Sequence, residues 1–141
     1  MNKLTLVVFL FTAIWATAAD TKPVVNRDGN CVVSVPSNWT VDPMFGMGSS
    51  PDKKVNVIVS SPKHGLATLD QAEQLAPTMY PDDKITKKYG SEFEMEGKNQ
   101  AGKPNFYRAV PAGAKICIAE ITYESGSPAD AKAIIETLKA K

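Results

Sequence analysis

The sequence predicts an α+β domain: an antiparallel β-sheet of about six or seven strands with helices packed on both faces, an α/β/α sandwich. Short β-branched runs separated by turn residues occur before residue 61 and again from residue 85 onward. Two apolar stripes with helical spacing lie between and after them. The resulting order is two or three strands, a helix, three or four strands and a final helix, which favours antiparallel pairing.

Residues 1–19 have the pattern of a secretory signal peptide. Lys3 supplies a positive charge, residues 4–15 are apolar, and residues 16–19 are small, as signal cleavage requires. The apolar run of about 12 residues is shorter than the roughly 20 that a membrane-spanning helix needs. We therefore expect an exported protein, periplasmic or secreted, with residues 20–141 as one domain that has no stable membrane insertion after signal removal.

The charges of the mature domain are balanced. The chain has 16 basic residues, of which only Lys3 precedes residue 20, and 15 acidic residues, so residues 20–141 have no formal net charge. Proteins that bind nucleic acid normally show a basic excess on one face. The composition therefore argues against a nucleic-acid partner.

The two cysteines are Cys31 and Cys117, and the single histidine is His64. In an oxidising compartment two cysteines predict one disulfide, and the alternative is a pair of buried thiols that act as small apolar side chains. The spacings match no zinc pattern. The sequence therefore predicts no metal, no cofactor and no catalytic residues.

The N-terminal half predicts a short strand and a hairpin. Residues 20–30 are polar and are interpreted as a lead-in to a strand at residues 31–36, which ends at Pro36. Trp39 follows in a turn and is expected to anchor over the sheet edge. Residues 43–49 and 54–60 form a hairpin around a turn at 50–53. In its second arm, alternate valines share one face, with Asn56 and Ile58 on the other.

A helix is expected at residues 68–76, because Thr68 and Gln71 form a capping box and Pro77 ends the regular helix. Residues 85–124 then alternate as three or four antiparallel strands. In the segment 92–96 the two apolar residues are expected to face inward and the three glutamates to face solvent. The last helix begins near Ser127, with Pro128 and Asp130 in its first turn.

Nearly the whole mature chain resembles the PsbP-like (DcrB-like) family of small exported domains. The resemblance is carried by segments 35–39 (VPSNW), 55–62 (VNVIVSSP), the capped helix from Leu69, the strand at 115–123 and the closing segment 134–138 (IIETL). It implies an antiparallel sheet with helices on both faces and a role in binding or in supporting an assembly. It transfers no catalytic residue.

Three function classes remain open. The first is a non-catalytic accessory or binding domain that supports an envelope or secreted protein complex through a protein partner. The second is a carrier of a small molecule or lipid, with an apolar cleft near Trp39. The candidate ligand or partner surface comprises Trp39, Met44, Phe45, Met47 and Tyr80. The third, a small secreted hydrolase, would use Asp82 and Asp83 with Tyr80 or His64.

Overall fold

The structure of the chain, a computed structural model, describes residues 20–62, 70, 74, 84–89, 92–99, 101–124 and 128–141. The described strands and helix are β1 (Thr21–Val25), β2 (Cys31–Pro36), β3 (Thr40–Asp42), β4 (Met47–Ser49), β5 (Val55–Ser60), β6 (Lys84–Tyr89), β7 (Glu92–Lys98), β8 (Pro104–Ala112), β9 (Lys115–Tyr123), α2 (Pro128–Ile135) and β10 (Lys139–Ala140).

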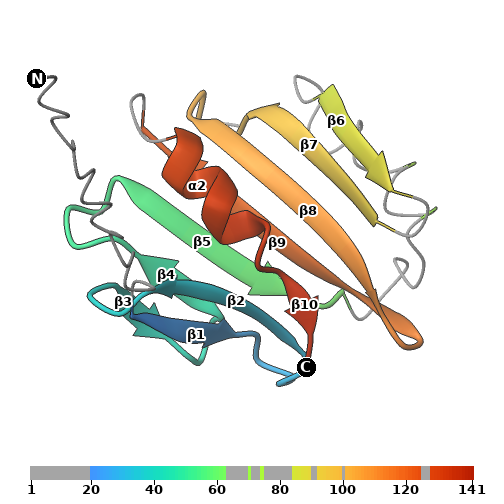
Figure 1. Cartoon of the computed structure of the whole chain (residues 1–141), viewed down its shortest axis with the longest axis horizontal. Coiled ribbons are helices and arrows are strands. Elements are labelled where there is room, and N and C mark those ends of the chain that lie inside the picture. Colours follow the sequence, from blue (N-terminus) through green and yellow to red (C-terminus); the bar gives the residue numbers. More distant parts are fainter. Residues whose placement is uncertain are drawn as a thin grey trace, which may run out of the picture.

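The strands form two antiparallel sheets. The larger has seven strands in the order β3-β4-β5-β9-β8-β7-β6, and the smaller has three in the order β1-β2-β10. Figure 1 shows α2 and the small sheet side by side on one face of the large sheet. The described chain is therefore mostly β, and the predicted α/β/α sandwich with helices on both faces is wrong.

The prediction missed the small sheet, because the sequence analysis interpreted residues 20–30 as a polar lead-in. Residues 21–25 form a strand whose Val24 lies opposite Val33 of β2. On the other side of β2, Lys139 pairs with Val32 at the C-terminal end of the chain. These two pairings make β2 the centre of a separate sheet, and that sheet packs beside α2 on one face of the large sheet.

Other expected elements agree with the structure. The strand predicted at 31–36 is β2, the hairpin arm at 54–60 is β5, and residues 85–124 contain most of the four strands β6 to β9. The final helix begins at Pro128. The helix expected at 68–76 lies outside the described residues, apart from Asp70 and Gln74, which are helical and exposed.

The main core lies between the two sheets and α2. Alternate valines of β5 face it, since Val57 lies opposite Ile121 of β9 in the large sheet and both are fully buried. The small sheet contributes Val33, and α2 contributes Ile135. Because these side chains come from three packed units, burial of apolar area holds the small sheet and α2 against the large sheet.

One glutamate expected to face solvent is buried. Glu94 of β7 lies opposite Arg108 of β8, and its Oε1 accepts a hydrogen bond from Arg108 Nη1 at 2.9 Å. Glu96 is exposed and Met95 is buried, as expected. The prediction failed at Glu94 because sequence alternation does not show which residue the neighbouring strand places opposite it.

Candidate functional site

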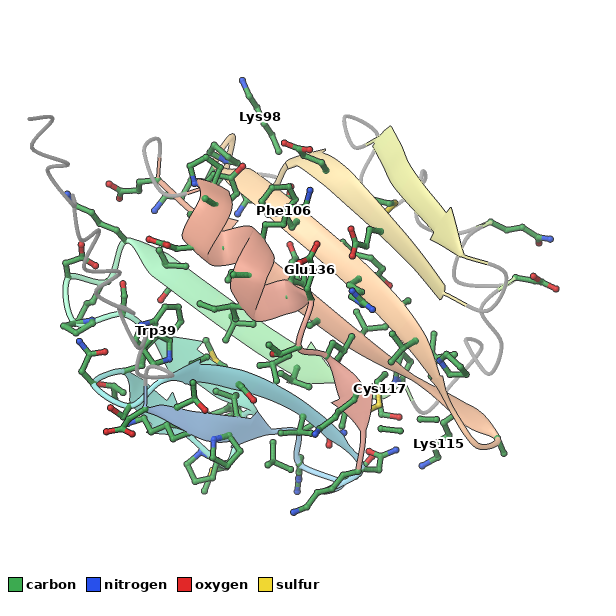
Figure 2. The ribbon with its side chains drawn as sticks, in the orientation of Figure 1. Trp39, Lys98, Phe106, Lys115, Cys117 and Glu136 are labelled. Carbon is green, nitrogen blue, oxygen red and sulfur yellow. A yellow bond between two sulfur atoms is a disulfide. The ribbon has the colours of Figure 1, made fainter. Side chains whose placement is uncertain are left out.

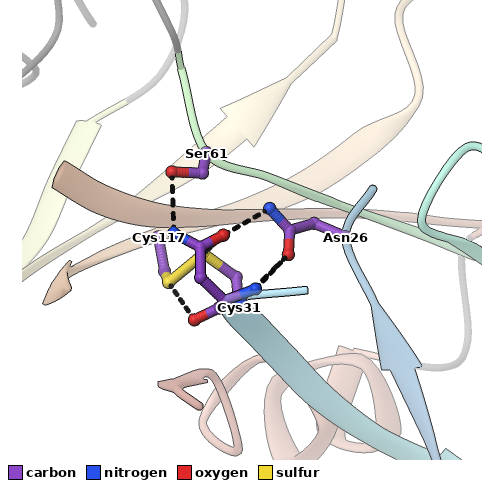
Figure 3. Close-up of a disulfide and its surroundings, with 5 residues drawn as sticks. Asn26, Cys31, Ser61 and Cys117 are labelled. Atoms are coloured by element: carbon purple, nitrogen blue, oxygen red, sulfur yellow. Dashed lines mark hydrogen bonds between the residues drawn. A yellow bond between two sulfur atoms is a disulfide. The ribbon is translucent and has the colours of Figure 1, made fainter. Parts of the chain in front are cut away.

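A disulfide between Cys31 and Cys117 joins the first residue of β2 to β9, as the sequence analysis expected. Asn26 supports it, because its Oδ1 accepts hydrogen bonds from the backbone N–H groups of Asn30 (3.1 Å) and Cys31 (2.9 Å). Asn30 Nδ2 donates to Ser61 Oγ at 3.3 Å. Figure 3 shows this cluster at the end of β2. It fixes one end of the small sheet on the large sheet.

Trp39 is held at the other end of β2. Its backbone N–H donates a hydrogen bond to the Pro36 carbonyl at 3.1 Å and so closes a turn. The residue is only 6% exposed. Figure 2 shows Trp39 beside β2. A Cβ at Gly48 would lie 2.9 Å from Val24 Cγ2 and 3.6 Å from Trp39 Cε3, so the absence of a side chain on β4 allows this close packing.

A cleft of about 590 Å³ opens beside Trp39, between the small sheet, the turn before β5, and α2. We call it the Trp39 cleft. Its size lies within the roughly 300–1,000 Å³ range of small-molecule sites. Its described lining residues are Thr21, Ser34, Pro36, Trp39, Ser50, Pro51, Asp52, Val55, Asp130, Ala133, Ile134 and Thr137.

Polar groups of the Trp39 cleft are ordered by local hydrogen bonds. Ser50 Oγ donates to Asp52 Oδ1 at 2.6 Å and accepts from Val55 N–H at 3.0 Å. The bond from Ser50, with a further one from the Lys54 N–H, holds the pKa of Asp52 below its ordinary value of 3.8. On the opposite wall, Thr137 Oγ1 accepts from Ser34 N–H at 2.8 Å and donates to the Ile134 carbonyl.

A second feature is the turn at residues 43–46, between β3 and β4. Met44 is 68% exposed and Phe45 is 64% exposed. Asp42 Oδ1 accepts hydrogen bonds from the N–H groups of Met44 (2.9 Å) and Phe45 (3.4 Å). A hollow of about 380 Å³ adjoins it, lined by Asn26, Arg27, Asp28, Met44, Phe45, Val59, Ser60 and Ser61.

Gly46 ties this turn to β5. Its φ is +63°, in the left-handed region, and its carbonyl accepts a hydrogen bond from Val59 N–H at 2.8 Å. A Cβ at this position would lie 2.7 Å from the Val59 carbonyl oxygen and 3.0 Å from Asn26 Cα. Only glycine fits both the φ and the space, so the backbone of the turn is anchored while its apolar side chains project outward.

The structure places the residues of the predicted candidate surface in separate regions. Trp39 lines the Trp39 cleft, whereas Met44 and Phe45 line the hollow beside the turn at residues 43–46. Met47 is partly buried and lies opposite Ile58 on the neighbouring strand. Tyr80 lies outside the described residues. Sequence reasoning therefore identified one residue of the cleft but placed it together with residues that do not line it.

The polar residues of the cleft were not identified from the sequence as site residues. Asp52 was interpreted as a turn residue and Asp130 as a helix N-terminal residue, and both interpretations agree with their local structure. Their common position on the cleft depends on how α2 packs beside the turn before β5. Spacing along the chain contains no signal of that contact, because 78 residues separate the two.

A buried tyrosine lies on the large sheet outside both features. Tyr107 of β8 is buried opposite Glu120 of β9. Burial, and then the negative charge of Glu120, raise the pKa of the Tyr107 hydroxyl above its ordinary value.

The residues proposed for a hydrolase, His64, Tyr80, Asp82 and Asp83, all lie outside the described part of the chain. Within the described ranges, no three His, Cys, Asp or Glu side chains gather as metal ligands would. Nor does any helix there have the length and apolarity to cross a membrane.

No protein-family model and no curated protein matches this chain. A solved structure shares its arrangement of elements. The solution structure of cyanobacterial PsbP (CyanoP) from Synechocystis sp. PCC 6803 superposes with a TM-score of 0.52, over 94% of this chain and 99% of that one. The fold is PsbP-like. At 11% identity the likeness shows the PsbP-like fold alone, and any activity or partner has to be argued from the residues.

Proposed function

We propose that this PsbP-like chain is an exported, non-catalytic accessory domain that binds a protein partner through the turn at residues 43–46. The observation that carries the proposal is the exposure of Met44 and Phe45, at 68% and 64%. With Ile58, they are the large apolar side chains that the described residues leave exposed. Exposed apolar residues that lie together commonly mark interaction sites.

The hydrogen bonds that order the backbone of this turn support binding. Asp42 holds the amides of Met44 and Phe45, and Gly46 is hydrogen-bonded to Val59. A partner that buries the two side chains would therefore order few backbone dihedrals, and preorganisation of this kind reduces the entropic cost of association.

The surroundings of the turn fit a protein surface as the occupant. Phe45 and Met44 supply apolar anchors, and the adjoining hollow adds Arg27, Asp28 and the hydroxyl groups of two serines. Protein interfaces commonly combine an apolar centre, enriched in aromatic residues and methionine, with a polar rim. Both signs of charge occur in this rim, so it favours neither a polyanion nor a polycation.

Export of the domain is supported by two features of the chain. Residues 1–19 have a signal-peptide pattern, and Cys31 is joined to Cys117 in a disulfide. Disulfides persist in oxidising compartments outside the cytosol. These features support an assignment of the domain, in this proposal, to the periplasm or the secreted fraction, where its partner would also be found.

Site-specific photo-crosslinking tests the proposal. The full chain would carry a photoreactive phenylalanine analogue at position 45 or, as a control, at Lys115 in the exposed end of the β8–β9 hairpin, which Figure 2 shows at the far side of the molecule from β3 and β4. We expect one protein from the envelope or secreted fraction of the native host to be crosslinked reproducibly from position 45 and not from position 115.

A matched variant defines the outcome. Met44→Ser should reduce the yield of the crosslink from position 45, because the substitution removes the neighbouring apolar anchor. The control substitution Lys139→Ser, at another exposed position, should leave that yield unchanged. Equal crosslinking from positions 45 and 115, or none from position 45, would contradict the proposal.

A second function is favoured by a separate observation. The Trp39 cleft has the volume of a small-molecule site and an apolar wall that includes Trp39 and Ile134. A carrier role therefore remains the alternative to the accessory role, and the two can be separated because the cleft and the turn share no described lining residue.

A further inference from the structure

We propose that the Trp39 cleft binds a small organic cation with an apolar body, such as an arylalkyl ammonium. The inference goes beyond the accessory role and does not depend on it, because it concerns different residues on a different surface. It rests on the charges of the lining, on the apolar wall and on the size of the cleft.

The charges of the lining are of one sign. Asp52 comes from the turn before β5 and Asp130 from the first turn of α2, and the described lining contains no Lys, Arg or His. Two carboxylates from separate elements at one cleft attract a cationic group and repel an anionic one. The cleft thus contrasts with the hollow at residues 43–46, whose lining includes Arg27.

Each carboxylate has a favourable local environment in the fold. Asp52 accepts hydrogen bonds from Ser50 Oγ and Lys54 N–H, and the charge of Lys54 adds a smaller attraction. Lys54 is exposed and does not line the cleft. Asp130 lies in the first turn of α2, where the partial positive charge of the helix end attracts a negatively charged side chain. Asp130 thereby occupies the helix end that would otherwise attract an anion.

The apolar wall fits the body of such a ligand. Trp39, Val55 and Ile134 line the cleft with Pro36 and Pro51. The part of the indole ring that lines the cleft can pack against both aromatic and alkyl groups. A volume of about 590 Å³ accommodates a ligand with a phenyl ring and a short alkyl chain. A metal ion has no apolar part that could pack against this surface, whereas an arylalkyl ammonium has one.

Three probes of matched shape test the charge preference: 4-phenylbutylammonium, 4-phenylbutanol and 4-phenylbutyrate. Binding would be measured by calorimetry and by the fluorescence of Trp39 in the full chain with Trp15→Phe, which leaves Trp39 as the sole tryptophan. We expect the ammonium to bind saturably, the alcohol to bind at least about fivefold more weakly and the butyrate more weakly still.

Two variants localise the effect. Asp130→Asn should weaken binding of the ammonium about two- to fivefold, the range for one exposed charge pair, and leave the alcohol unaffected. Asp28→Asn, which neutralises a carboxylate at the other hollow, should change neither affinity. Equal affinity for the ammonium and the alcohol, a preference for the butyrate, an absence of saturable binding, or equal effects of the two variants would overturn the inference. None of these results bears on the crosslink from position 45.

Discussion

Trp39 and Phe45 are aromatic residues six positions apart, yet one is 6% exposed and the other 64%. At Trp39 the side chain itself is packed, against the strand that carries Gly48. At Phe45 the backbone is anchored instead, through hydrogen bonds of Asp42 and Gly46, and the side chain remains exposed to solvent. The contrast separates an aromatic residue that stabilises the fold from one that the fold presents to its surroundings.

The largest effect should come from truncating the packed member of this pair. Trp39→Ala should lower the free energy of unfolding by about 3–5 kcal/mol, because it removes a buried indole and leaves a cavity. Phe45→Ala should change it by less than about 0.5 kcal/mol, as is usual for an exposed position. Urea unfolding followed by circular dichroism measures both. Similar losses in the two variants would show that the exposed turn also contributes to stability and would remove the contrast.

An intermediate effect is expected where the backbone of the turn is anchored. Gly46→Ala should cost about 1–3 kcal/mol, since alanine is strained at a φ of +63° and its Cβ would lie 2.7 Å from the Val59 carbonyl oxygen. Gly102→Ala is the matched control: its φ is +74°, but no atom lies within 4 Å of the added Cβ. The difference between the two unfolding free energies isolates the close contact. A loss at Gly46 no greater than at Gly102 would show that β5 yields to the new methyl group.

The smallest effect concerns Asp52, at the edge of the Trp39 cleft. Its folded-state pKa lies below 3.8, mainly because Ser50 Oγ donates to it. A depressed pKa stabilises the fold above the unfolded-state value, and this contribution is lost as the pH falls through the folded-state value. Ser50→Ala should therefore raise the pKa of Asp52 toward 3.8 and reduce the acid dependence of stability. Carbon-13 NMR titration of the Asp52 carboxyl would measure this shift. An unchanged pKa in the Ser50→Ala variant would show that the Lys54 backbone N–H and the Lys54 charge lower the pKa instead.

The sequence predicted local structure better than the arrangement of layers. Pro36 ended a strand as expected, and Pro128 opened a helix. In contrast, residues 21–25 were missed as a strand because Lys22 and Pro23 interrupt the apolar pattern. These residues form a strand because β2 lies beside them and pairs with them in register. The strand therefore depends on contacts between segments more than on the β-propensity of its own residues.

The same limit explains the site. Sequence reasoning selected Trp39 and Phe45 for their size and apolarity, which are visible in the chain. It could not show that Trp39 packs against β4 while Phe45 projects from a turn. That difference depends on the close approach of Val24 to Gly48 and of the Val59 carbonyl to Gly46, which the sequence does not show. Asp52 and Asp130 were likewise recognised only for their local roles. Their common position follows from the packing of α2.

The bond between Cys31 and Cys117 closes a covalent ring of chain, with 86 positions separating its ends. β3 to β8 lie inside the ring, whereas β1, α2 and β10 lie on the two tails outside it. A protease that cuts once inside the ring, including at the turn that presents Phe45, opens the ring but releases no fragment until the disulfide is reduced. A single cut between β9 and α2 meets no such covalent restraint. Packing and the pairing of β10 with β2 alone would then retain the tail that carries Asp130.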